Sequence, residues 1–208
     1  MAALFLIITA LMSYAFGGFN GAIIISKYIM KKDIRDYGSG NAGLTNFYRT
    51  FGAAGALMVL LVDVLKSIIP ILVGGALMGS LGYEMVGKLY SGFCLMLGHS
   101  YPAMYGLRGG KGALCGAVLI IMADWRAGVI CLLVFLIVVV FSRYVSLGSI
   151  AAAVVYPITL LIFQHGGLCA MLGLFCSLLL IFQHRGNIGR LLTGSESKLE
   201  LRKTKPAY

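Results

Sequence analysis

The stretch Ala53–Leu77 reads A-A-G-A-L-M-V-L-L-V-D-V-L-K-S-I-I-P-I-L-V-G-G-A-L, and its only charges are Asp63 and Lys66. A membrane-spanning helix needs about 20 mostly apolar residues, so this stretch is long enough to cross a bilayer. The two charges are three residues apart and share one helix face. Charges at membrane depth usually face the bundle interior. The sequence leaves open whether they form a mutually neutralising structural pair or help to shape a functional site.

Six further apolar segments indicate that most of the chain consists of membrane-spanning helices. Hydrophobic residues make up 60% of the 208, and the mean hydropathy is +0.93. An open sheet cannot sit in lipid, and the alternation of a membrane barrel is absent. We therefore expect an all-α fold, a polytopic integral membrane bundle of about seven transmembrane helices. The further segments are Ala2–Tyr28, Met85–Tyr105, Gly112–Ala123, Ala127–Phe141, Leu147–Phe163 and Leu168–Phe182.

The charge distribution predicts how this bundle is oriented. The chain has 17 Lys and Arg against 7 Asp and Glu, and cytoplasmic loops of membrane proteins collect Lys and Arg. With the N-terminus outside and the C-terminus cytoplasmic, only Lys88 and Arg126 lie on the outer side and Lys66 lies within the membrane. We expect one domain over residues 1–208, of which residues 185–208 form a polar cytoplasmic tail.

The basic inner face predicts anionic lipid and anionic substrates as partners. No RNA-binding signature is present, so we expect no nucleic acid partner. The five cysteines lie in or beside apolar runs without a C-x-x-C pair, which is typical of small membrane-core residues and not of a disulfide framework or zinc site.

Three polar clusters fall on the inner side of this topology. The first, Tyr37–Gly52, carries four glycines and one cation, Arg49. Glycine lets backbone N–H groups approach a ligand, successive N–H groups form an anion nest, and Arg49 could grip a phosphate with two hydrogen bonds. This pattern indicates phosphate binding at a membrane surface. A flexible loop followed by a helix cap explains the first cluster equally well.

The second and third clusters carry the same kind of chemistry. Leu107–Gly112 (L-R-G-G-K-G) lacks the spacing of a nucleotide-binding P-loop, and it is either an anion nest around Lys111 or a tight turn between helices. In the third cluster, His184 and Asn187 point the same way if the turn is helical. His184 could bind a phosphate or accept a proton, or it could be an interfacial side chain that reaches the headgroups.

Polar groups gathered at one end of a bundle favour an enzyme that joins a lipid-soluble chain to a water-soluble anion. A transporter usually places such groups near the membrane midplane, between two repeats. A transporter for a small phosphorylated or anionic solute is nevertheless the alternative function. The sequence contains neither the H-x-x-x-x-D motif of soluble-type glycerolipid acyltransferases nor a G-x-S-x-G nucleophile elbow.

The three clusters also carry a family resemblance. The segments S-G-N-A-G-L-T-N-F-Y-R-T-F-G (39–52), G-H-S-Y-P-A-M-Y-G-L-R-G-G-K-G (98–112) and H-R-G-N-I-G-R-L-L-T-G-S-E (184–196) resemble the three signature motifs of the bacterial acyl-phosphate:glycerol-3-phosphate acyltransferases, the PlsY family. The Asp63 and Lys66 pair resembles that family's second helix. Order, spacing, length and topology all agree with this family.

The resemblance implies transfer of a fatty acyl group from acyl phosphate to the 1-position of sn-glycerol 3-phosphate, which forms lysophosphatidic acid and phosphate, the first step of phospholipid biosynthesis. It further implies a multi-pass protein of the bacterial plasma (inner) membrane, with its active site at the cytoplasmic face. An enzyme that forms acyl phosphate would act alongside it. No cofactor and no metal are expected.

The site residues that the resemblance implies have two roles. Arg49 and Lys111 would be the main phosphate-binding cations, and they would act in catalysis with His184 and Asn187. We further hypothesise that His184 positions phosphate and that a substrate phosphate assists removal of the hydroxyl proton, although the residues leave His184 open as the general base. The complete predicted substrate-binding set is Ser39, Gly40, Asn41, Thr45, Asn46, Arg49, His99, Gly109, Gly110, Lys111, Gly112, His184 and Asn187.

Overall fold

The computed structural model describes residues 1–199, and this part of the chain is helical with no strand. The predicted all-α class is therefore confirmed. The last nine residues of the predicted polar tail, with Arg202, Lys203 and Lys205, lie outside the described residues. The described part of that tail begins with a short helix, α9 (Arg185–Leu192), which lies beside the end of α8.

Five helical segments are long and apolar enough to cross a membrane: Ala2–Ile29, α3 (Leu44–Gly79), α6 (Trp125–Ser142), α7 (Val145–Ile162) and α8 (Gly166–Gln183). Two shorter helices complete the predicted segments. They are α4 (Glu84–Ser100) and α5 (Ala113–Ala123), and α5 is only about 16 Å long at 1.5 Å per residue. The count of seven spans stays a prediction.

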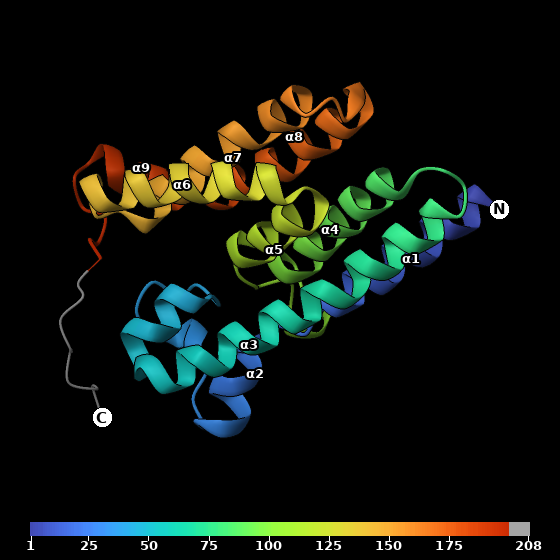
Figure 1. The fold of residues 1–208 in the computed structure, drawn as a ribbon. Helices are drawn as coiled ribbons and strands as arrows, with labels where there is room; N and C mark the ends of the chain where they lie inside the picture. The colour runs from blue at the N-terminus through green and yellow to red at the C-terminus, as the bar shows by residue number, and fades with distance from the viewer. Residues whose placement is uncertain (200–208) are drawn as a thin grey trace.

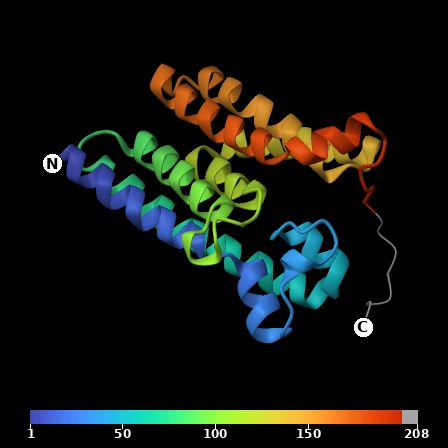
Figure 2. The same cartoon turned by 180° about the vertical axis from the view of Figure 1, so that it is seen from behind.

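The helices form two groups, which Figures 1 and 2 show from opposite sides. α1 (Ala2–Gly18), α3 and α4 contact one another, and α7 lies between α6 and α8. Between the groups, α4 contacts α8, while α5 contacts α3, α4 and α6. The groups diverge toward the end that carries α9 and the start of α3.

The first apolar segment is broken, unlike the continuous helix expected from Ala2–Tyr28. α1 ends at Gly18, and the chain resumes as α2 (Gly21–Ile24) and a π-helical turn, Ile25–Ile29. The Asn20 side-chain oxygen accepts a hydrogen bond from Ile23 N at 3.1 Å, and its amide nitrogen donates to Ala42 O at 3.1 Å. Asn20 therefore caps α2 and ties the break to the first polar cluster, because such side chains compete with helical backbone bonds.

The second apolar segment begins earlier than its expected start at Ala53. α3 starts at Leu44, inside the first polar cluster, and changes direction at Gly52, whose φ of 81° favours glycine. Phe47 and Phe51 are buried with Ile23 and Ile34 in a small apolar cluster of its own. The burial of these aromatic side chains explains why the second half of the polar cluster is helical and not a loop.

The third segment ends before its expected end at Tyr105. α4 stops at Ser100, and a single 3₁₀ turn, Ala103–Tyr105, follows Pro102. Proline restricts the residue before it to extended conformations, which ends the helix. The chain then returns across the end of α4, since Gly109 N donates to Ser100 O and Gly110 N to His99 O, both at 3.1 Å.

α1 and α4 approach so closely that their backbones touch. A Cβ at Gly98 would overlap the carbonyl oxygen of Tyr14, and a Cβ at Gly17 would overlap that of Leu95. Small residues permit such contacts between membrane helices. This contact positions the end of α4, with His99, beside the break that follows α1.

We predict that Gly98→Ala destabilises the protein by about 1–3 kcal/mol, because the added methyl group meets fixed backbone and not a movable side chain. The melting temperature in detergent measures this effect. Gly167→Ala is the matched control, since a Cβ there has no neighbour within 4 Å. Equal melting temperatures for the two variants would contradict the proposed α1–α4 contact.

Candidate active site

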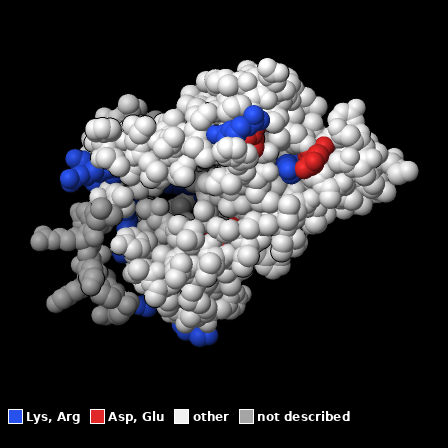
Figure 3. All heavy atoms as spheres, viewed as in Figure 1, with Lys and Arg blue, Asp and Glu red and all other residues white. Residues whose placement is uncertain are grey.

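A cavity of about 400 Å³ opens between the two helix groups at the end where they diverge. Figure 3 shows a hollow there, and some of the visible Lys and Arg side chains border it. Polar residues from all three sequence clusters line one part of the cavity. Apolar side chains from α5, α6 and α7 line the rest, among them Leu114, Leu132 and Phe135.

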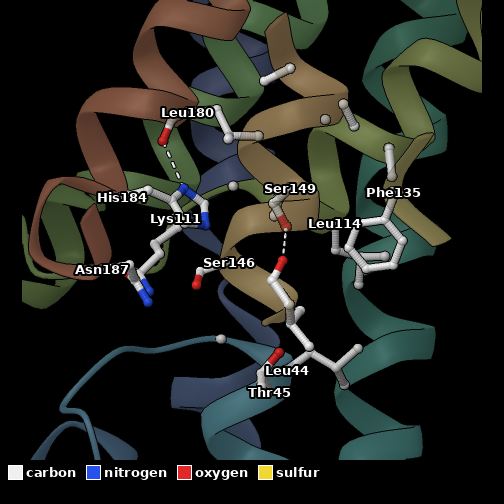
Figure 4. A pocket seen from close by; sticks show the side chains of 18 of the residues that line it. Leu44, Thr45, Lys111, Leu114, Phe135, Ser146, Ser149, Leu180, His184 and Asn187 are labelled. Atoms are coloured by element: carbon white, nitrogen blue, oxygen red, sulfur yellow. Dashed lines mark hydrogen bonds between the residues drawn. The ribbon is translucent and has the colours of Figure 1, made fainter. Parts of the chain in front are cut away.

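The cavity brings together most of the predicted site residues. Figure 4 shows Lys111, His184 and Asn187 around one space, with Ser146 and Thr45 on neighbouring sides of it. Gly40, Gly109 and Gly110 do not line the cavity. The predicted residues that do line it are Ser39, Asn41, Thr45, Asn46, Arg49, His99, Lys111, Gly112, His184 and Asn187.

Asn46 is buried, and its amide group is occupied by the first cluster itself. Its oxygen accepts from Ser39 N at 3.0 Å, and its nitrogen donates to Tyr37 O at 3.0 Å and Asn41 O at 3.1 Å. Because these bonds use both ends of the amide, Asn46 shapes the loop that presents Ser39 and Asn41. Thr45 lies at the start of α3, where backbone N–H groups lack helical partners.

The sequence left open whether the stretch around Lys111 is an anion nest or a tight turn, and its glycines do not form such a nest. The N–H groups of Gly109 and Gly110 donate to carbonyl oxygens of α4, so they are not available for a ligand. The open N–H groups belong instead to the first turn of α5. Gly116 N is the first amide of this helix to donate a hydrogen bond to a backbone oxygen of the preceding turn, Gly112 O, at 2.8 Å. A helix N-terminus with free N–H groups and a positive dipole end suits an anion.

Lys111 adds a cation whose charge depends on pH. Burial lowers the pKa of its ammonium group to about 8, because desolvation disfavours the charged form. Arg190 and Arg49 also lower it, whereas Glu196 opposes the shift. Lys111 is therefore mostly charged at pH 7 and loses its charge a short way above that pH.

His184 is buried at the junction of α8 and α9. Its Nδ1 lies 2.8 Å from Leu180 O, and since a carbonyl only accepts, Nδ1 carries the proton (Figure 4). Burial lowers the pKa of His184 to about 4, and the nearby Lys111 acts in the same direction. The ring is thus neutral near pH 7, and its Nε2 carries a lone pair.

Glu196, Ser146 and Arg190 line the cavity but are absent from the predicted set. Glu196 accepts hydrogen bonds from Asn187 at 2.6 Å, from Ser146 at 2.7 Å and from Arg190 at 2.7 Å. Burial acts to raise the pKa of Glu196, but these three bonds hold it below its usual value. Glu196 closes the third cluster, so its position gave a sequence signal, whereas nothing in the sequence around Ser146 distinguishes it.

Arg49 reaches the chain that follows Glu196. Its guanidinium donates to Ser197 O at 3.2 Å and to Lys198 O at 3.4 Å. The segment 196–198 therefore lies over the polar end of the cavity and is held from both helix groups. Carbonyl oxygens are the partners of Arg49 here, and a phosphate oxygen is a stronger acceptor for the same donors.

This geometry fits a reaction between two unlike molecules. Cations, amides and a helix N-terminus at one end of the cavity suit phosphate groups. The apolar wall, in which Leu114 and Phe135 lie, suits a hydrocarbon chain (Figure 4).

Comparison with known proteins identifies the family. The family model "Glycerol-3-phosphate acyltransferase" matches residues 7–194. A protein of that name from Thermoanaerobacter pseudethanolicus is 40% identical, over 94% of this chain and 96% of its own length. Another of that name, from Shouchella clausii, is 41% identical, over 93% of this chain and 96% of its own length.

Two solved structures have the same fold. A crystal structure of PlsY (YgiH), an integral membrane glycerol 3-phosphate acyltransferase, in its glycerol 3-phosphate form, matches with a TM-score of 0.85 and 29% identity, over 94% of this chain and 96% of its own. The lysophosphatidic acid form matches with a TM-score of 0.81 and 28% identity, over 94% and 95% of the two chains. The predicted family is confirmed: this chain is a helical membrane acyltransferase that belongs to the glycerol-3-phosphate acyltransferase (PlsY) family.

Proposed function

We propose that the protein transfers a fatty acyl group from acyl phosphate to the 1-position hydroxyl of sn-glycerol 3-phosphate, forming lysophosphatidic acid and inorganic phosphate as the first step of phospholipid biosynthesis. The observation that carries this proposal is one cavity with a cationic end and an apolar wall. A glycerol 3-phosphate form and a lysophosphatidic acid form of a similar protein support it.

The reaction needs mainly the positioning of two anions. The glycerol hydroxyl attacks the acyl carbonyl carbon, a new ester C–O bond forms, and the bond from that carbon to the phosphate oxygen breaks with phosphate leaving. Because phosphate is a good leaving group, no covalent intermediate is required. Arg49 and Lys111 hold the phosphate groups, and the first turn of α5 stabilises developing negative charge.

The hydroxyl proton passes to a phosphate oxygen of the bound substrates. A phosphate monoester has its second pKa near 6, whereas that of His184 is about 4. The phosphate is therefore the stronger base of the two. Nδ1 of His184 donates its proton to a hydrogen bond with Leu180 O, so Nε2 can only accept. His184 is therefore left to orient a phosphate group by accepting a hydrogen bond from the phosphate oxygen that carries the proton, beside the Asn187 amide.

The charges support a cytoplasmic active site in a bacterial plasma membrane. In Figure 3, Lys and Arg without a visible acidic neighbour lie toward the cavity end, whereas the visible acid–base pairs lie away from that end. The pairs Glu84–Lys88 and Asp124–Arg126 begin α4 and α6 at that other end. This arrangement supports the proposal of seven spans with the N-terminus outside. An acyl-phosphate-forming enzyme supplies the donor, since a mixed anhydride is too reactive to accumulate.

We predict that Arg49→Ala and Lys111→Ala each lower kcat/KM for glycerol 3-phosphate about 10- to 100-fold, because each removes a charge-assisted hydrogen bond to phosphate. The measurement is lysophosphatidate formation by purified protein in lipid. Lys88→Ala is the matched control, since Lys88 pairs with Glu84 at the other end of α4. Unchanged kcat/KM in both site variants would contradict the proposed phosphate site.

We predict an alkaline limb in the pH profile. As pH rises above about 8, free Lys111 loses its proton, and kcat/KM for glycerol 3-phosphate falls. Arginine keeps its charge throughout this range. Lys111→Arg is therefore expected to abolish the limb or to move it beyond pH 10, even if its overall rate is lower. If kcat/KM of Lys111→Arg fell above pH 8 as in the parent, the alkaline limb would belong to a group other than Lys111.

We predict that His184→Gln raises KM for glycerol 3-phosphate but retains kcat within about tenfold. Glutamine still offers polar atoms to the phosphate, and proton removal by substrate phosphate does not need the imidazole. A loss of kcat on the order of 10²- to 10⁴-fold, as expected for removal of a general base, would instead make His184 the base. Steady-state kinetics with both substrates varied separates the two outcomes.

A further inference from the structure

Lys66 is buried in the bundle, and its ammonium group is surrounded by protein acceptors. It lies 2.8 Å from Asp63 Oδ1, 3.2 Å from Gly17 O and 3.1 Å from Phe19 O. Asp63 Oδ1 also accepts from Gly21 N at 3.0 Å. This pair thus satisfies backbone groups on both sides of the break in the first segment. All N–H groups of Lys66 are hydrogen-bonded to protein atoms, so none is available to a substrate.

The fourth neighbour of the Lys66 ammonium is the imidazole of His99, with Nδ1 at 2.9 Å. An ammonium group can only donate, so Nδ1 must accept and cannot carry the ring proton. The proton of neutral His99 is therefore on Nε2. The three N–H groups of Lys66 serve four acceptors, so one N–H is shared between two of them. The other three acceptors hold the ammonium group against Nδ1, which fixes the tautomer of His99.

The Nε2–H of His99 has no acceptor among residues 1–199. The residue is 3% exposed, and it lines the cavity together with Lys111. The ring lies against Gly110, where a Cβ would overlap Nε2. Gly110 N donates to His99 O, so the loop that carries Lys111 is attached to the same residue. The unpaired Nε2–H belongs to a buried side chain that lines a ligand cavity, so a ligand bound there can supply the acceptor.

We propose that His99 donates a hydrogen bond from Nε2 to a substrate oxygen, and that Asp63 and Lys66 are positioning residues that hold His99 in this tautomer. This inference rests on the proposed function, in which acyl phosphate and glycerol 3-phosphate meet in the cavity. The acceptor is a phosphate oxygen or the acyl oxygen that becomes negative in the transition state. As a neutral donor held by a cation, His99 takes no part in removing the hydroxyl proton.

Nitrogen NMR of ¹⁵N-histidine-labelled protein in nanodiscs tests the tautomer without any activity. The chain has three histidines, and His165→Gln and His184→Gln assign the signals by elimination. We expect a proton on Nε2 and a bare Nδ1 for His99 in the parent, and a mixture of tautomers in Lys66→Met. Lys88→Met is the matched control and is expected to leave the signal unchanged. A proton on Nδ1, or a charged ring, in the parent would overturn the inference.

Kinetics test whether the donor acts on a substrate. His99→Phe keeps the ring but removes the donor, and we expect kcat/KM to fall on the order of 10²-fold. His99→Gln restores an N–H close to Nε2 and is expected to recover at least tenfold of that loss. His165→Phe, at the opposite end of the bundle where His165 pairs with Asp124, is the control expected to retain activity. Full activity in His99→Phe would overturn the proposal.

The kinetic split identifies the oxygen. A fall in kcat at unchanged KM assigns the bond to the acyl oxygen, because that interaction strengthens only in the transition state, whereas a rise in KM assigns it to phosphate. Failure of the proposed function is distinguishable: a parent protein inactive with acyl phosphate rejects that function, while the NMR result still decides the tautomer. A His99→Phe variant that does not fold leaves the decision to the NMR result and to His99→Gln.

Discussion

The buried contact of Lys66 with Asp63, His99 and the end of α1 is the constraint on which the rest of the site depends. A charge at membrane depth is tolerated only when the protein satisfies it completely. Here one ammonium group joins three helices at the level where the first segment breaks. The break lets Asn20 bind the first polar cluster, and the fixed His99 holds the loop before Lys111. Arg49 and Lys111, the two cations proposed to bind phosphate, are thus positioned from one buried point.

The divergence of the two helix groups gives the cavity its chemistry. Where the groups part, the polar residues at the start of α3 and before α5 line one side of the cavity, and the α8–α9 junction lines another. Apolar helix surface lines the rest of the same cavity. A phosphorylated, water-soluble acceptor and a lipid-soluble donor can meet only at such a boundary. Glu196 and Arg49 add contacts across the gap through the segment that follows α9. In the proposed reaction, the same arrangement makes a covalent nucleophile unnecessary.

The sequence predicted the helical membrane class, the family and most of the residues that meet in the cavity. These features depend on long apolar runs and on residue order, which are visible in one dimension. It did not predict the helix from Leu44 or the turn at Gly52, because buried contacts of Phe47 and Phe51 override a polar-looking stretch. It left open whether Leu107–Gly112 is an anion nest or a tight turn, and the N–H groups of Gly109 and Gly110 are bound to α4. Ser146 joins the site only through tertiary packing, and no local pattern marks it.

The most direct test of this account is the choice of acyl donor. Purified protein in lipid would receive labelled glycerol 3-phosphate with acyl phosphate, acyl-CoA or acyl carrier protein in separate reactions. The account predicts labelled lysophosphatidate from acyl phosphate alone, because the cationic end of the cavity is built for small phosphate groups. Product from acyl-CoA or acyl carrier protein but not from acyl phosphate would keep the family and contradict the proposed chemistry.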